Sequence, residues 1–213
     1  MKTIAIVQAR LGSKRFPNKV LKEINNSSLI ELLLKRLSLA KEVDEIVVAT
    51  TTSPIDDRLQ FVVENLGFKV FRGSDSDVLD RYLHAAEDCG AETIVRITGD
   101  CPLIDPKLVD SCIAEFHMGN FQYLSNSNPP SFPDGLDTEV FSIESLRNAA
   151  KNATDSYDRE HVTPFIRKGL SHFCGTFHSE IDYSNYRWTV DEYQDYIVVE
   201  NIFKYFSPKI DFD

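Results

Sequence analysis

A loop rich in cationic residues follows the first apolar run of the chain. In Gln8-Ala-Arg-Leu-Gly-Ser-Lys-Arg-Phe-Pro-Asn-Lys19, a glycine and a serine accompany four cations. Small residues let backbone amides approach and donate to phosphate oxygens, while Arg10, Arg15 and Lys19 neutralise phosphate charge. The GxxxxGK[ST] spacing of a Walker A loop is absent. The loop therefore indicates a phosphate site of another kind, although a solvated basic loop has the same composition.

Two aspartates follow apolar segments further along the chain. Asp100 comes after Val95-Arg-Ile-Thr-Gly99, and Asp191 comes after Trp188-Thr-Val190. Mg²⁺ prefers oxygen ligands and usually accepts only one or two from protein, with phosphates and waters completing its shell. The two aspartates predict a Mg²⁺ site, whereas either one could instead close a turn or cap the next helix.

Asp75-Ser-Asp77 matches the DxD pattern with which many glycosyltransferases hold a metal and a sugar nucleotide. The motif is short, and Asp77 could simply cap a helix predicted over residues 78–88. A glycosyltransferase therefore stays open as an alternative function. A nucleotide-binding module without turnover is a second alternative, because a fold does not guarantee an activity.

The net charge and its distribution along the chain indicate which kind of ligand the protein binds. The 213 residues carry a net charge of −10, which argues against a general nucleic-acid binder. Residues 1–22 contain six cations and no carboxylate. A cationic patch on an acidic body suggests a small polyanionic ligand held at one place.

Cysteines and histidines give no metal motif. Cys89, Cys101, Cys112 and Cys174 lack the paired spacing of a zinc or redox site, and no HExxH is present. No apolar run is long enough to cross a bilayer, and the run Thr3 to Val7 is too short for a signal peptide. We expect a cytoplasmic protein with no membrane span.

Short apolar runs alternate with amphipathic segments along most of the chain. The predicted strands cover about residues 3–8, 45–50, 68–71, 93–97, 138–141 and 172–177. The predicted helices cover about residues 29–39, 55–65, 78–88, 106–116, 143–151, 156–167 and 192–206. Capping signals are Ser28 with Glu31 and, before the fourth helix, Asp105.

This alternation predicts an α/β fold with a doubly wound, mostly parallel sheet whose ligand lies beyond the carboxyl ends of the strands. One domain over residues 1–213 is expected, because the length suits one well-buried core. The turn-rich stretch after Phe121 predicts an irregular excursion over about residues 121–145, covering the acceptor site.

Six motifs in this order resemble the cytidylyltransferase family that includes CMP-sialic acid and CMP-Kdo synthetases, with the greatest likeness to its SpsF-like spore-coat polysaccharide branch. They are QARLGSKRFPNKVL, FRGSDSDVLDRY, VRITGDCPLIDP, DGLDTEVF, REHVTPFI and RWTVDEYQD. The resemblance implies a Rossmann-like fold and transfer of CMP from CTP to a sugar-acid-like or phosphorylated acceptor with release of pyrophosphate. It also implies a role in surface polysaccharide or glycoconjugate biosynthesis, and it is compatible with a homodimer.

The resemblance also implies roles for individual residues. Catalysis is expected from Arg10, Lys19 and Asp100, and Mg²⁺ binding from Asp100 and Asp191. The expected nucleotide-binding residues are Gln8, Ala9, Arg10, Gly12, Ser13, Arg15, Lys19, Arg72, Asp77 and Arg81. Acceptor-binding candidates lie in the irregular later motifs, opposite the nucleotide loop: Asp137, Glu139, Arg159, Glu160 and His161.

Overall fold

One seven-stranded sheet runs through the molecule in the computed structural model, which describes residues 1–169, 173–207 and 209. Its strand order is β5 (Lys69–Gly73), β4 (Glu45–Thr51), β1 (Thr3–Gln8), β6 (Thr93–Thr98), β8 (Glu139–Ser142), β7 (Tyr123–Ser125) and β9 (Cys174–Thr176). Only β8 runs antiparallel to its neighbours. The predicted mostly parallel sheet is confirmed.

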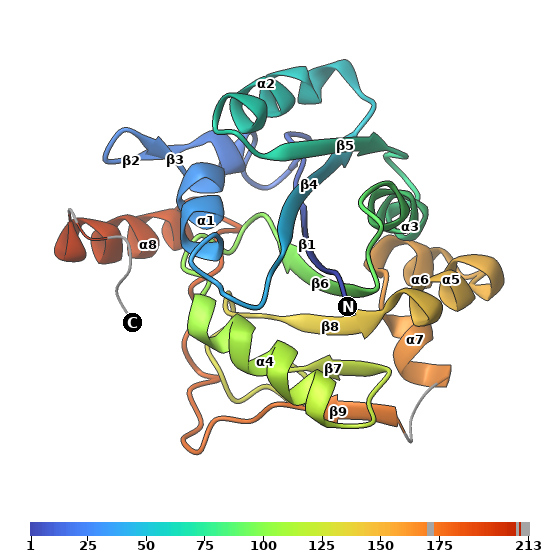
Figure 1. Cartoon of the computed structure of the whole chain (residues 1–213). Coiled ribbons are helices and arrows are strands. Elements are labelled where there is room, and N and C mark those ends of the chain that lie inside the picture. The colour runs from blue at the N-terminus through green and yellow to red at the C-terminus, as the bar shows by residue number, and fades with distance from the viewer. Residues whose placement is uncertain (170–172, 208, 210–213) are drawn as a thin grey trace.

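Helices cover both faces of this sheet (Figure 1). One face packs against α1 (Leu29–Leu37), α2 (Asp57–Asn65) and α4 (Pro106–Met118). The other packs against α3 (Val78–Asp88), α5 (Ile143–Asn152) and α7 (Pro164–Gly169), with α6 (Ser156–His161) beside α3. The result is the three-layered, doubly wound α/β architecture that the sequence predicts.

The first strand shows why the sheet needs cover on both faces. Ile4 and Ile6 point into the core under α3 and α5, whereas Ala5 and Val7 point into the core under α1 and α4. All four side chains have no exposed surface. A strand buried on both faces reads as a continuous apolar run, which is the pattern of residues 3–7.

The C-terminal helix α8 (Tyr193–Phe206) lies apart from these layers. Its Val199 and Phe203 pack in a small separate core with Ile24, next to the hairpin of β2 (Glu23–Ile24) and β3 (Ser27–Ser28). Figure 1 shows α8 extending from the side of the molecule that carries α1. None of the described helices has the length and apolarity that crossing a membrane requires.

The capping predictions hold in most details. Asp105 accepts hydrogen bonds from the amides of Lys107 and Leu108, and so begins α4. The Ser28 hydroxyl accepts from the Glu31 amide at 3.3 Å and begins α1. The reciprocal half of the predicted capping box is replaced, because the Glu31 carboxylate instead accepts from Ser27 and Lys35.

Two segments differ from the predicted elements. β7 lies where no strand was predicted, because three residues are too short to show a strand period, whereas β8 confirms the strand predicted over about residues 138–141. The helix predicted over residues 156–167 is divided into α6 and α7 at Val162, whose φ of 71° and ψ of −58° end α6. The strand predicted from residue 172 begins outside the described residues, and β9 starts at Cys174.

Gly135 fixes the loop before β8 against the segment before α8. Its φ is +110°, and a Cβ there would lie 2.5 Å from the Thr189 amide nitrogen and 2.6 Å from the Trp188 carbonyl carbon. The same loop receives two backbone hydrogen bonds, since the amides of Trp188 and Thr189 donate to the Asp134 carbonyl. Only glycine allows this contact between backbones.

We therefore predict that Gly135→Ala destabilises the chain by roughly 1–3 kcal/mol more than Gly67→Ala, the range typical of overpacking. Gly67 is the matched control, because its φ is also positive (+85°) but a Cβ would meet nothing within 4 Å. Urea unfolding of both variants measures the difference in the free energy of unfolding. If both variants lose the same free energy of unfolding, the close approach of Gly135 to residues 188 and 189 does not restrict the side chain at this position.

Candidate active site

A cavity of about 480 Å³ opens where the chain reverses its winding direction along the sheet. From β1 the chain winds to β4 and β5, and it then returns to β6 on the other side of β1. Ligands in doubly wound folds bind beyond the carboxyl ends of the two strands at such a switch point. The loop after β1 and the Thr98 to Asp100 turn after β6 line this cavity.

Gly99 brings these two loops together. Its amide donates to the Gln8 carbonyl at 2.8 Å, and a Cβ at this position would lie 2.9 Å from that oxygen and 2.8 Å from the Ala9 Cβ. A larger residue would push the loops apart. The glycine therefore holds Asp100 at the wall of the cavity that Gln8 and Ala9 also line.

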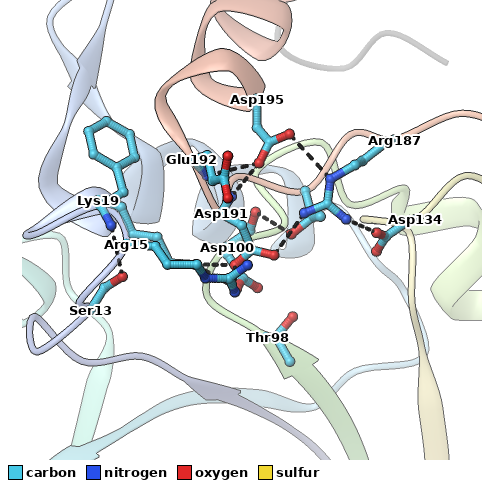
Figure 2. A network of polar contacts seen from close by, with 12 residues as sticks. Ser13, Arg15, Lys19, Thr98, Asp100, Asp134, Arg187, Asp191, Glu192 and Asp195 are labelled. Carbon is cyan, nitrogen blue, oxygen red and sulfur yellow. Dashed lines mark hydrogen bonds and ion pairs between the residues drawn. The ribbon is translucent and has the colours of Figure 1, made fainter.

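Lys19 joins the two aspartates predicted to bind metal (Figure 2). Its Nζ lies 2.9 Å from Oδ2 of Asp100 and 2.9 Å from Oδ1 of Asp191. Only 11% of the Lys19 side chain is exposed. Segments separated by 81 and 172 residues in sequence thus meet at one ammonium group.

Asp191 is held from three further directions. Arg15 Nη2 lies 2.9 Å from its Oδ1, and Arg187 Nη2 lies 2.8 Å from its Oδ2. The Asp195 carboxylate accepts from the Asp191 amide at 2.9 Å, and it also pairs with Arg187 Nε at 3.2 Å. The sequence interpretation did not assign a site role to Arg187, Asp134 or Asp195, although Arg187, Asp191 and Asp195 recur at four-residue intervals within one motif.

Arg187 also reaches Asp134, in the loop before β8. Figure 2 shows Arg187 between Asp134 on one side and Asp191 and Asp195 on the other. The aspartate that would bind metal is therefore fixed to the β8 loop as well as to the loop after β1.

The network shifts the pKa values of its members. Burial lowers the pKa of Lys19, but the attraction and hydrogen bonds of Asp100 and Asp191 outweigh it, so that the pKa rises above its ordinary value. Burial raises the pKa of Asp191, and the contacts with Lys19, Arg187 and Arg15 outweigh it and lower the pKa. Each charged form is therefore favoured by its partner.

Asp100 and Asp191 converge on a single cation, the ammonium group of Lys19. An ammonium group at 2.9 Å from both carboxylates marks a point where their oxygens can share positive charge. Within the described residues no group of three or more His, Cys, Asp or Glu side chains is placed to hold a metal. A cation bound here would draw its remaining ligands from a substrate or water, as Mg²⁺ does.

Cations dominate the lining of the cavity. Five cationic side chains face three carboxylates there: Arg10, Lys14, Arg15, Lys19 and Arg81 against Asp100, Glu160 and Asp191. Arg81 is 2% exposed, and its Nε has no hydrogen-bond partner. No carboxylate of the described residues forms an ion pair with it, and burial lowers its pKa. A buried guanidinium without a counter-ion suits an anionic ligand.

A second cavity of about 190 Å³ adjoins the first through Thr98 and His161, which line both. Its lining includes Asp137 and Glu139. The Glu139 carboxylate is buried, pairs with Arg96, and accepts from the hydroxyls of Tyr123 and Thr163, each at 2.6 Å. Burial raises the pKa of Glu139, but these partners outweigh it and lower the pKa.

The structure brings together most of the residues that the sequence indicates. The first cavity is lined by Gln8, Ala9, Arg10, Gly12, Ser13, Arg15, Lys19, Arg81, Asp100, Glu160, His161 and Asp191. The second is lined by Asp137, Glu139 and His161. Three candidates line neither cavity: Arg72, Asp77 and Arg159.

Those three side chains make structural contacts instead. Arg72 pairs with Asp57 and donates to the carbonyls of Thr51, at the end of β4, and of Ser53, two residues later. Asp77 begins α3 by accepting from the Asp80 amide, and its other oxygen pairs with Arg159. The signal for the cap, an aspartate directly before a helical run, is present in the sequence.

A doubly wound sheet with a cationic cavity and paired aspartates at its switch point defines a nucleotide-binding α/β protein. The chain belongs to the cytidylyltransferase family, whose model matches residues 4–201. Its resemblance to SpsF-like proteins and CMP-Kdo synthetases is thereby confirmed at the level of the family.

Relatives and solved structures agree with this assignment. An uncharacterized protein of Methanocaldococcus jannaschii is 40% identical over 97% of the chain and 85% of its own length. The spore coat polysaccharide biosynthesis protein SpsF of Bacillus subtilis is 33% identical over 93% of the chain and 85% of its own length. A cytidylyltransferase structure from Leptospira borgpetersenii has 34% identity and a TM-score of 0.95, covering 100% of the chain and 90% of its own.

A more distant structure shows the same fold. The CMP:2-keto-3-deoxy-manno-octonic acid synthetase complexed with CTP has a TM-score of 0.75 and 17% identity, over 96% of the chain and 99% of its own.

We predict that Lys19→Met lowers the free energy of unfolding at pH 7 by about 1.5–3 kcal/mol, the range for hydrogen bonds to charged groups. The folded-state pKa of Asp191 is lowered, so the stability it contributes is present above its ordinary pKa and is lost as the pH falls through the lowered value. The deficit of the variant should therefore shrink between pH 7 and pH 3, as urea unfolding can measure.

Lys14→Met is the control, because Lys14 lines the same cavity but is exposed and pairs with no described carboxylate. A deficit in Lys19→Met that persists unchanged at pH 3 would contradict an electrostatic origin.

Proposed function

We propose that the chain transfers CMP from CTP to a sugar acid or related acceptor and releases pyrophosphate. The observation that carries this proposal is the convergence of Lys19 on Asp100 and Asp191 inside a cationic cavity at the switch point. Membership of the cytidylyltransferase family supports CTP as the nucleotide. A structural neighbour is described as complexed with CTP, which supports the same choice.

The triphosphate would lie along the loop after β1. A Cβ at Gly12 would meet nothing within 4 Å, so space for a ligand lies beside the backbone of this loop. Arg10 and Arg15 are exposed at the cavity and Arg81 is buried in its wall. These cations neutralise phosphate charge and place the α-phosphorus beside the carboxyl ends of β1 and β6.

Asp100 and Asp191 would hold Mg²⁺ together with phosphate oxygens. The bound ion would supply electrostatic stabilisation of the charge that moves onto pyrophosphate. Lys19 and Arg10 line the same cavity, and their positive charges would stabilise the leaving group.

The acceptor would occupy the second cavity. Asp137, Glu139 and His161 line it, and Thr98 and His161 line the first cavity as well. Arg167 also lines it and pairs with no described carboxylate, so a guanidinium is available for an acidic acceptor. A neighbour whose description names 2-keto-3-deoxy-manno-octonic acid points to the same acceptor class.

The likeness to SpsF supports a role in surface polysaccharide or glycoconjugate biosynthesis. We place this activity in the cytoplasm, where CTP is available to it.

The contacts of Asp77 weigh against the glycosyltransferase alternative. One of its carboxylate oxygens caps α3, the other pairs with Arg159, and the residue lines neither of the two cavities. Asp75 pairs with Arg10 at 2.8 Å. The Asp75-Ser-Asp77 motif is therefore explained by the start of α3.

A nucleotide-by-acceptor screen tests the proposed function. CTP, UTP and ATP are each incubated with Mg²⁺ and a panel of 2-keto-3-deoxy-manno-octonic acid, sialic acid and sugar phosphates, while pyrophosphate is measured. We expect pyrophosphate with CTP and at least one sugar acid. Nucleoside diphosphate released from a sugar nucleotide would favour a glycosyltransferase, and CTP binding without turnover would favour a non-catalytic module.

We predict that Asp100→Asn lowers kcat by at least about 10²-fold and raises the Mg²⁺ concentration required for half-maximal rate, because a metal ligand loses its charge. Asp105→Asn is the matched control. It makes the same change five residues later, lines neither cavity, and keeps a side chain that begins helices equally well. Unchanged Mg²⁺ dependence in Asp100→Asn would remove this residue from the metal site.

A further inference from the structure

Asp137 is a carboxylate in the second cavity with no partner of its own. It stands two residues before Glu139, in the loop that Gly135 fixes against residues 188 and 189. Within the described part of the chain, no side chain forms a hydrogen bond or ion pair with the Asp137 carboxylate, whereas Glu139 has three partners. The cavity thus contains one carboxylate that is fully engaged and one that is free to accept a proton.

The surroundings of Asp137 disfavour its charged form. Burial is the largest cause, repulsion from Asp134 and Glu139 adds to it, and together they raise the pKa of Asp137 to about 6. Arg96 opposes this shift only in part. Charged or titratable groups lie around it on several elements: Arg96 on β6, Glu139 on β8, Asp134 and Asp100 in the adjoining loops, Tyr157 and His161 on α6, and Arg167 on α7.

A carboxylate with such a pKa is ionised at neutral pH and is a stronger base than an exposed aspartate. Bases whose pKa lies near the operating pH are the most effective in proton transfer. Asp191 differs in this respect, because its contacts with Lys19, Arg187 and Arg15 outweigh burial and lower its pKa.

A strained turn lies between two residues, His161 and Thr163, that line the same cavity as Asp137. The Thr163 amide donates to the His161 carbonyl at 2.8 Å across Val162, whose φ of 71° and ψ of −58° are those of a classic γ-turn. This conformation is rare, and it is costly for a β-branched residue. It separates α6 from α7, so that His161 lines both cavities while Thr163 lines the second and donates to Glu139. Strain of this kind typically marks functional sites.

From this geometry we infer that Asp137 is the general base that accepts the proton of the acceptor hydroxyl. The inference rests on the proposed function and assigns the base for that reaction. The acceptor O–H bond breaks and its proton passes to the Asp137 carboxylate. The freed oxygen electron pair forms the bond to the α-phosphorus of CTP, the bond from that phosphorus to the bridging oxygen breaks, and pyrophosphate leaves with the electrons.

Asp137→Asn tests the role. With CTP, Mg²⁺ and the sugar acid of the panel that reacts fastest, we expect kcat to fall by roughly 10²–10⁴-fold, the usual contribution of a general base. The KM for CTP should stay unchanged. In the wild-type chain kcat/KM for the acceptor should fall as the pH falls through about 6, where Asp137 is protonated, and Asp137→Asn should lack this acid limb.

The effect of Asp137→Asn on folding stability distinguishes a general base from a residue that only stabilises the fold. Because the folded-state pKa of Asp137 is raised, its ionised form costs stability at pH 7, and the neutral Asn should leave the unfolding midpoint in urea unchanged or higher. A structural carboxylate would give the opposite result. Glu144→Gln is the control for loss of one charge, since Glu144 is exposed at the start of α5 and lines neither cavity.

The outcomes also separate the two proposals. If the wild-type chain releases no pyrophosphate with any acceptor, the proposed function fails and the role of Asp137 fails with it. If the wild-type chain is active and Asp137→Asn keeps both its rate and its acid limb, only the role of Asp137 is overturned.

Discussion

The site depends on one electrostatic constraint, the shared contact of Lys19 with Asp100 and Asp191. Two carboxylates at the same edge of a sheet repel each other unless a cation lies between them, and the Lys19 ammonium group meets this need at 2.9 Å from each. This contact joins the loop after β1, the turn after β6 and the segment before α8. In the proposed function, a metal with phosphate ligands would meet the same need.

The two cavities shift the pKa values of their carboxylates in opposite directions. This difference suits the separate roles that the proposed reaction gives to Asp191 and Asp137. In the larger cavity Asp191 is surrounded by cations and its pKa is lowered, which suits a ligand that must stay charged. In the smaller cavity Asp137 has no described partner and its pKa is raised, which suits a group that gains and loses a proton. Environments that shift the pKa values of acidic groups apart commonly mark separate roles.

Two close backbone approaches and one strained turn constrain the loops around these cavities. Gly135 and Gly99 permit backbone approaches that a Cβ would prevent, and Val162 holds a strained turn between α6 and α7. Each fixes a loop that contributes to the site, namely the β8 loop, the turn after β6 and the junction lined by His161. The buried core on both faces of the sheet supplies the stability that such features require.

The sequence by itself determined the doubly wound architecture and the nucleotide loop, because apolar periodicity and capping are local signals that act within a few residues. It also indicated Asp100 and Asp191, since each follows an apolar segment and precedes a helix. Only the tertiary structure decided that these aspartates share Lys19, that Arg187 ties Asp191 to the β8 loop, and that Asp77 and Arg159 pair with each other. The contacts of Lys19 with the aspartates, of Arg187 with Asp134 and of Asp77 with Arg159 each span tens of residues, so no local pattern encodes them. The pKa of Asp137 likewise depends on burial and on charges from several elements.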